Sequence, residues 1–195
     1  MTTPPVDRPR IEAAVLELLA AIGEDVDRPG LAATPRRVAE SYAEFFAGLT
    51  VDAVDLVARS AVPAEQHHLG ELVIVRDISF RSMCEHHLLP FVGVAHVAYL
   101  PGESIVGLGA LPRVVDAVAS RPQLQERLGE EIAEAVSAGA QPDGVLVVLD
   151  AAHGCVTTRG PRQTGSTTVT LASRGALSDP AARAEAVALI GAPRG

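Results

Sequence analysis

Apolar residues recur at helical spacing through the first quarter of the chain. Over residues 11–22 they stand three or four positions apart, which predicts an amphipathic helix that ends at Gly23. A second apolar stripe, over residues 38–46, follows Thr34 and Pro35. Threonine is a good N-cap and proline fits the first helical turn, so this stripe predicts a second helix. The chain is therefore expected to open with an antiparallel helical pair.

Beyond residue 70 the apolar period changes to two. Apolar runs rich in β-branched residues predict strands at residues 72–80, 91–100, 144–150 and 166–172. Helical spacing returns in three segments, which predicts helices at 108–119, from Pro122 and from about Asp179. Helices thus separate two β-hairpins, and this order predicts an α+β fold with a mainly antiparallel sheet.

The composition is that of a globular chain with its own hydrophobic core. Of the 195 residues, 48% are hydrophobic and 21% are charged, and a chain of this size needs no disulfide to fold. The net charge of −8, the absence of Trp and an aromatic content of 3% argue against a nucleic-acid partner. The sequence has no run of 18 apolar residues and no signal-peptide pattern, so we expect no membrane partner and a cytoplasmic location.

The strongest chemical motif is Cys84-Glu85-His86-His87. Its C-x-x-H spacing lets one turn present a thiolate and an imidazole to a single ion, and Zn²⁺ favours such ligands. Cys155, which also lies near a histidine, could supply a third ligand. Three protein ligands with water as the fourth describe a catalytic zinc site. The alternative is that both cysteines are inert buried thiols.

Histidines and arginines add further candidate chemistry. His86 and His153 are left over as general acids or bases, or as hydrogen-bonded histidines without a catalytic part. Guanidinium groups bind phosphate oxygens, and an acidic protein needs such groups clustered in order to attract a polyanion. The candidates are Arg37, Arg113 and Arg159, each of which, taken alone, is more often a surface ion-pair residue.

Several blocks of the sequence together resemble the GTP cyclohydrolase I family. Gln125 and Glu126 pair an amide with a carboxylate, which could read the N–H edge of a guanine or simply line a solvated helix face. They lie within one of the matching blocks. In chain order these blocks are Thr34–Val38, Ser82–Phe91, His96–Pro101, Gln123–Leu128 and His153–Gly160. The resemblance runs from about residue 10 to residue 190.

The resemblance implies a fold, an assembly and a reaction. The fold would be a tunnelling fold (T-fold) over residues 61–195, the catalytic domain, with helices on one face of its sheet. A helical region over residues 10–60 and a flexible N-terminus over residues 1–9 would precede it. Family members form homo-oligomers, here expected as a decamer of two pentameric rings with active sites between subunits. The reaction would be zinc-dependent hydrolysis of the guanine imidazole ring of GTP, which releases formate and gives 7,8-dihydroneopterin triphosphate, the first step of pterin and folate biosynthesis.

The resemblance also assigns roles residue by residue. Zinc would be held by Cys84, His87 and Cys155. Proton transfers would fall to His153 and His86, and the guanine edge would be held by Gln125 and Glu126. The triphosphate would be held by Arg113 and Arg159, with Arg37 reaching in from a neighbouring subunit.

The sequence departs from the family pattern at Gly109-Ala110, where members usually have Ser-Lys. The chain has no lysine at all, and a compositional bias would predict arginine at position 110 instead of alanine. Losing one charge-assisted phosphate contact typically costs about 1.5–3 kcal/mol. The candidate zinc ligands, both histidines and the Gln125-Glu126 pair are nevertheless all present, so GTP cyclohydrolase I activity, weakened by this loss, is the first hypothesis. The alternatives are a paralogue with the same zinc chemistry on another purine nucleotide or nucleoside, and a non-catalytic ring subunit.

Overall fold

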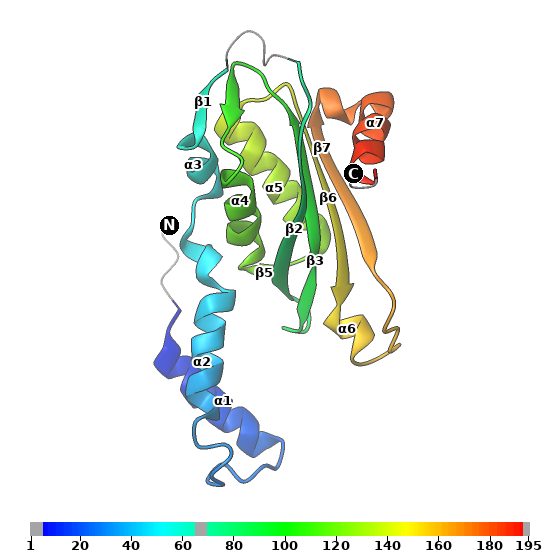
Figure 1. Ribbon diagram of the computed structural model, residues 1–195. Helices are drawn as coiled ribbons and strands as arrows, with labels where there is room; N and C mark the ends of the chain where they lie inside the picture. The colour runs from blue at the N-terminus through cyan, green and yellow to red at the C-terminus, as the bar shows by residue number, and fades with distance from the viewer. Residues whose placement is uncertain (1–5, 65–69, 193–195) are drawn as a thin grey trace.

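The computed structural model describes residues 6–64 and 70–192, and the chain opens with two helices that project from its body (Figure 1). Helix α1 (Arg8–Ala21) is capped by the Asp7 carboxylate, which accepts a hydrogen bond from an N–H of the first turn. Helix α2 (Thr34–Phe45) has proline in its first turn and packs against α1. We call α1 and α2 the helical arm. The helical pair is confirmed, and residues 1–5 of the expected flexible N-terminus lie outside the described residues.

A connector leads from the arm to the main sheet. It contains η1 (Ala47–Thr50), α3 (Ala53–Ala58) and β1 (Ala61–Pro63). Strand β1 pairs antiparallel with β4 (Ser104–Val106) in a separate two-stranded sheet. This small sheet lies at one end of the main sheet, and the hairpin tip of β2 and β3 lies at the opposite end of the main sheet (Figure 1).

The main sheet has the strand order β5-β2-β3-β6-β7. Its strands are β2 (Val73–Cys84), β3 (Pro90–Leu100), β5 (Pro122–Gln123), β6 (Gly144–His153) and β7 (Thr168–Gly175). All neighbours are antiparallel except β5, which runs parallel to β2. The remaining helices are α4 (Ala110–Ala119), α5 (Gln125–Ala140), α6 (Gly154–Thr157), η3 (Ala176–Ser178) and α7 (Pro180–Ile190).

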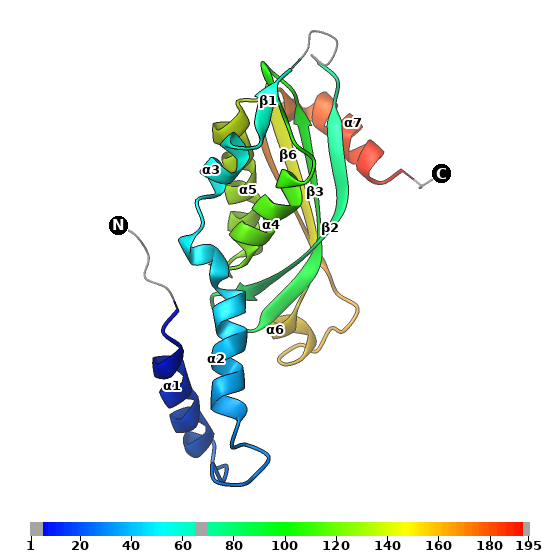
Figure 2. The ribbon, with the colours of Figure 1, turned by 60° about the vertical axis from the view of Figure 1, so that its left-hand side comes forward.

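Helices α4 and α5 cover one face of this sheet, and α7 covers part of the other (Figure 2). Strand β6 is buried on both sides over its first six residues. Val147 and Leu149 lie in the main core, whereas Leu146 and Val148 lie in a smaller cluster with Ala186 of α7. Burial of each such side chain stabilises the fold by about 1.5–3 kcal/mol. The antiparallel sheet with its covering helices confirms the predicted α+β class and the T-fold.

A bulge in β2 determines which face of the sheet carries Cys84. The pairing of β2 with β3 shifts register between Val75 and Ile78, and Asp77 within the bulge has a φ of 59°. The Asp77 N–H donates to Nδ1 of His96 at 3.1 Å. Side chains at odd positions face the main core before the bulge, and those at even positions face it afterwards. Cys84 therefore lies on the core face.

Several boundaries differ from the sequence prediction, and two of the differences lie beside Cys84. Strand β2 continues to Cys84, past the predicted end at residue 80. Pro122 does not open a helix: it pairs with Met83 in the parallel β5–β2 contact, and α5 begins at Gln125. Proline has no N–H to donate, and an edge strand tolerates this because one side of its backbone has no partner strand. No helix among the described residues is both long and apolar enough to cross a membrane.

Candidate metal and active site

Three ligand side chains from two distant segments converge at one end of the sheet. Cys84 ends β2, His87 lies in the turn that follows, and Cys155 lies in α6. Their ligand atoms all lie within 4.8 Å of one another. Cys84 is buried, Cys155 is half-buried and His87 is exposed, so the group opens to solvent on the histidine side. We call these three residues the metal triad, because together they could hold one metal ion.

The β2–β3 turn presents two members of the triad through its backbone. The Cys84 N–H donates to the Leu89 carbonyl at 2.9 Å, and the Leu88 N–H donates to the Cys84 carbonyl at 2.8 Å. Leu88 has a φ of 49°, a left-handed conformation that closes the turn tightly. The Glu85 N–H donates to the carbonyl of Gln123 at 3.1 Å, which ties the turn to β5.

Helix α6 brings Cys155 close to the β2–β3 turn because the residue before Cys155 is a glycine. A Cβ on Gly154 would lie 2.7 Å from the carbonyl oxygen of Pro90, closer than real Cβ contacts allow. The glycine therefore lets the start of α6 pack directly on β3 beside the β2–β3 turn. This explains in steric terms why the residue between His153 and Cys155 carries no side chain.

His153 is held in a fixed orientation at the end of β6. Its ring stacks on Phe91 of β3, with the centroids 4.7 Å apart and an interplanar angle of 6°. Its Nε2 lies 2.7 Å from Oε1 of Gln125. Burial lowers the pKa of His153, and the Glu126 carboxylate opposes that shift. The ring is thus neutral near pH 7 and a stronger acid than usual when protonated.

The Gln125 side chain is 2% exposed and is engaged within the protein. Its Nε2 donates to the carbonyls of Leu149 at 3.3 Å and Thr168 at 2.8 Å, and to Oγ1 of Thr170 at 3.2 Å. Because the groups around Nε2 of Gln125 accept hydrogen bonds, the Gln125 atom that faces His153 is the amide oxygen. An amide oxygen can only accept, so His153 is the donor in the hydrogen bond between the two side chains. His153 therefore carries its proton on Nε2, and Nδ1 is the nitrogen free to exchange one.

The other predicted polar residues are exposed. Glu126 follows Gln125 in the first turn of α5 and directs an exposed carboxylate near enough to His153 to influence its pKa. His86 lies in the β2–β3 turn with its ring centroid 6.3 Å from that of His87. Arg159 lies just beyond α6, where its charge affects the Cys155 thiol.

Burial raises the pKa of the Cys155 thiol, the nearby Cys84 thiol raises it further, and Arg159 opposes both. The Cys155 thiol therefore stays protonated more readily than an ordinary cysteine, until a bound cation compensates the charge of the thiolate. The two cysteines are free thiols in the structure, so both sulfur atoms are available as ligands.

Two predicted phosphate ligands lie away from the metal triad within one chain. Arg37 is exposed on α2 of the helical arm. Arg113 lies on α4, exposed beside Pro112 and Asp116 in a separate surface pocket. Helix α4 lies part-way along the main sheet, whereas the turn and α6 lie at the end of the main sheet away from β1 and β4 (Figure 1). A single chain thus brings together the triad, both candidate catalytic histidines, Gln125, Glu126 and Arg159, but not Arg37 or Arg113.

Sequence reasoning missed Phe91 and the internal role of Gln125. Phe91 carries the signal of an ordinary core residue in an alternating strand, and it is 1% exposed. Its contact with His153 depends on the register of β3 with β6, in which Phe91 and His153 are direct partners. That register could not be read from either strand alone.

Comparison with known proteins places the chain in one family. A family model described as GTP cyclohydrolase I matches residues 11–191. The chain is 66% identical over 185 residues to GTP cyclohydrolase 1 of Leifsonia xyli, covering 95% of this chain and 96% of that protein. It is 52% identical over 182 residues to GTP cyclohydrolase 1 of Bacillus subtilis, covering 92% and 94% respectively. Because the match extends over nearly the whole chain, this protein belongs to the GTP cyclohydrolase I family.

Proposed function

We propose that this protein is a GTP cyclohydrolase I, which opens the guanine imidazole ring of GTP by hydrolysis, releases formate and forms 7,8-dihydroneopterin triphosphate. The observation that carries the proposal is the metal triad, with ligand atoms within 4.8 Å of one another, next to the oriented ring of His153. Family membership over residues 11–191 supports the same reaction. The product would enter pterin and folate biosynthesis.

The donor set of the triad fits zinc. Two thiols and one imidazole are ligands that Zn²⁺ prefers, and three protein ligands leave a fourth position open for water or substrate. When bound, zinc would supply a Lewis acid that activates water for hydrolysis near neutral pH. The reducing cytoplasm is the proposed location, because it keeps both cysteines available as thiols.

His153 is the proposed proton donor to the imidazole nitrogen of guanine. Its Nε2–H is engaged by Gln125, so Nδ1 is the nitrogen that would take up a proton from solvent and pass it to the substrate. Its lowered pKa makes the protonated ring a stronger acid toward a weakly basic ring nitrogen. His86, two residues beyond Cys84 in an exposed turn, is proposed to assist further proton transfers.

Glu126 is the proposed contact to the N–H edge of guanine. Its carboxylate is exposed at the start of α5, and a carboxylate accepts two parallel hydrogen bonds from adjacent N–H donors. The sequence prediction gave Gln125 the same role. In the structure the amide N–H groups of Gln125 are engaged by the sheet, so we propose that Gln125 acts by holding His153.

The triphosphate is proposed to bind between subunits. Arg159 lies near the triad, whereas Arg37 and Arg113 lie on other parts of the chain. A homo-oligomer, proposed as a decamer of two pentameric rings, would bring Arg37 and Arg113 of neighbouring copies to each triad. Arginine is suited to this role because its guanidinium binds phosphate oxygens bidentately.

The Gly109-Ala110 segment favours a second candidate, hydrolysis of a purine nucleotide with fewer phosphates. Gly109 precedes α4, and an added Cβ there would meet no atom within 4 Å. Ala110 is 1% exposed and belongs to the main core. Neither residue offers a side-chain donor to an anion. If this segment weakens triphosphate binding, the variant Gly109→Ser, which adds a hydroxyl in open space and leaves the buried Ala110 in place, should lower KM for GTP more than KM for GMP.

A product assay tests the proposed function. Zinc-loaded protein is incubated with GTP, and products are followed by mass and, after oxidation, by pterin fluorescence. Neopterin triphosphate is the expected result. Accumulation of the ring-opened formamide alone would show that hydrolysis occurs without the later ribose rearrangement. Turnover of GMP, GDP or guanosine in place of GTP would support the second candidate. No turnover of any of them by zinc-loaded, assembled protein would refute both and indicate a non-catalytic subunit.

A further inference from the structure

The β2–β3 turn, which presents two members of the metal triad, is held against α5 by a side chain that is not itself a ligand. Glu85 lies between the ligand Cys84 and the proposed proton-transfer residue His86. Its carboxylate forms a charge-assisted hydrogen bond and ion pair with the guanidinium of Arg127 on α5. Its backbone N–H donates to the Gln123 carbonyl at 3.1 Å. Both ends of Glu85 are thus attached to the β5–α5 segment.

The Arg127 guanidinium is itself held in place. Its Nε donates to Oε1 of Gln123 at 3.0 Å, and the nitrogen that binds Glu85 also donates to the Pro122 carbonyl at 3.3 Å. Gln123 is 1% exposed, and its Nε2 donates to the Val118 carbonyl at 3.2 Å. An arginine oriented by a buried amide loses less side-chain freedom when it binds a carboxylate than a free surface arginine does.

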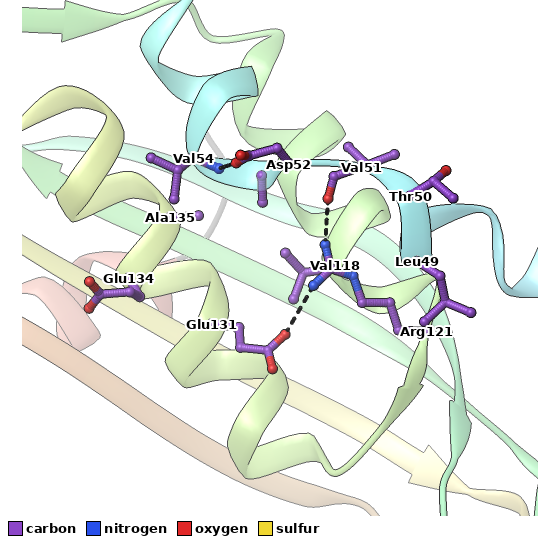
Figure 3. Close-up of a pocket in the computed structure, with 11 residues that line it drawn as sticks. Leu49, Thr50, Val51, Asp52, Val54, Val118, Arg121, Glu131, Glu134 and Ala135 are labelled. Atoms are coloured by element: carbon purple, nitrogen blue, oxygen red, sulfur yellow. Dashed lines mark hydrogen bonds and ion pairs between the residues drawn. The ribbon is translucent and has the colours of Figure 1, made fainter. Parts of the chain in front are cut away.

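The network continues to the connector that joins the helical arm to the main sheet. Nε2 of Gln123 also donates to Oε2 of Glu131 at 2.9 Å, and Glu131 lies 3.6 Å from NH1 of Arg121. Arg121 donates to the carbonyls of Gly48 at 3.0 Å and Val51 at 2.8 Å, beside a surface pocket of about 660 Å³ (Figure 3). The side chains that hold Glu85 are therefore fixed on several elements of the protein body.

We propose that Glu85 and Arg127 are positioning residues that set the β2–β3 turn in its metal-binding geometry. The same pair fixes the turn relative to the start of α5, which carries Gln125 and Glu126. In metal sites, partners that orient ligands without binding the metal typically change metal affinity or activity by about 10- to 100-fold when removed. The inference rests on the proposed function only in assuming that the triad binds a divalent metal.

The test measures Co²⁺ binding by the full-length protein, followed through the visible absorption of the cobalt–thiolate site. The variants are Glu85→Gln and Arg127→Met, with Arg127→Lys as the conservative change. The matched control is Glu130→Gln, which breaks the ion pair between Glu130 of the same helix α5 and Arg174 of β7. Thermal unfolding of each metal-free protein records any general loss of stability.

We expect Glu85→Gln and Arg127→Met each to weaken Co²⁺ binding by about 10-fold or more, while Glu130→Gln binds as the parent does. The double variant should be no weaker than either single variant, because the two residues act as one pair. Arg127→Lys should recover part of the affinity, because it keeps the charge but loses the fork that also engages Gln123.

Equal Co²⁺ affinity in parent, Glu85→Gln and Glu130→Gln would overturn the proposal, as would additive losses in the double variant. If Glu85→Gln does not fold, the comparison of Arg127→Lys with the parent decides in its place. Parent protein that binds no Co²⁺ would overturn it as well. Co²⁺ binding without turnover of any purine nucleotide would refute the proposed function and leave this inference standing.

Discussion

Replacement of Gln125 by methionine separates two roles that the sequence and the structure assign to this residue. The sequence pairs Gln125 with Glu126 at the guanine edge, which predicts a rise in KM on substitution. In the structure Gln125 accepts a hydrogen bond from His153, which predicts a fall in kcat instead. Methionine is similar in volume to glutamine, so it removes the hydrogen bonds without leaving a large cavity.

The size of each effect follows from the contacts that are lost. The Gln125 amide makes contacts with His153, two carbonyls and one hydroxyl while 2% exposed. The two N–H protons of the amide satisfy two of its three acceptors at a time, which with the His153 bond makes three hydrogen bonds. At roughly 1 kcal/mol net for each, Gln125→Met should destabilise the fold by about 3 kcal/mol. For a chain of this size that corresponds to a fall in melting temperature of roughly 6–12 °C. Loss of the tautomer and orientation of His153 should lower kcat by about 10- to 100-fold, whereas removing a general acid altogether costs about 10²–10⁴-fold.

The assay is steady-state kinetics with GTP below the melting temperature of each variant. His153→Ala sets the full loss of the proton donor, and Glu126→Gln sets the effect of weakening the proposed guanine contact. If Gln125 acts through His153, the double variant Gln125→Met/His153→Ala has the same kcat as His153→Ala alone. A Gln125→Met enzyme with unchanged kcat and a KM raised as in Glu126→Gln would refute the reasoning and restore the prediction from sequence.

Three further predictions follow from the site and the sheet. Cys155→Ser should abolish zinc binding at micromolar metal; an unchanged zinc content would contradict the metal triad. Gly154→Ala should displace α6 from Pro90 and lower metal affinity at least 10-fold, because the new Cβ would lie 2.7 Å from a carbonyl; dialysis against a chelator measures this. Burial lowers the pKa of His96 below 6.5, with the carboxylates of Asp77 and Asp150 opposing the shift and Arg76 adding to it. The stability from neutral His96 is therefore present above pH 6.5 and lost as pH falls through the lowered pKa. His96→Gln should flatten stability between pH 7.5 and pH 5 relative to the parent.

Periodicity identified most of the elements but not the feature that orients the first cysteine. A single alternating strand over residues 72–80 would place odd positions on one face throughout. In the structure the bulge at Asp77 reverses the parity, so Val75 and Ile78 share a face with Cys84. The sequence contains one sign of this, the polar Arg76-Asp77 pair that interrupts the apolar run. A bulge adds one unpaired residue to one strand, and only the partner strand shows where it lies.

The metal triad could be predicted because metal chemistry restricts residue type more strongly than packing does. The chain has two cysteines, each near a histidine, so few other sets of residues could supply the thiolate and imidazole ligands that a metal such as zinc prefers. The predicted arginines were harder to place, because arginine is also the usual surface cation of this lysine-free chain. Arg113 and Arg37 lie away from the triad within one chain, so their assignment depends on an assembly that no single-chain pattern encodes.

Gln125 and Glu126 show where residue type alone does not distinguish two neighbouring residues. The two residues are adjacent, and an amide beside a carboxylate suits a base edge equally well at either position. Successive residues on a helix point about 100° apart, so the start of α5 directs one side chain under the sheet and the other toward solvent. The buried residue must satisfy its polar atoms inside the protein, and the groups within reach are the carbonyls of β6 and β7 and the ring of His153. Burial thus places Gln125 against the histidine and leaves the Glu126 carboxylate exposed, a division that depends on the packing of α5 and not on the residue types.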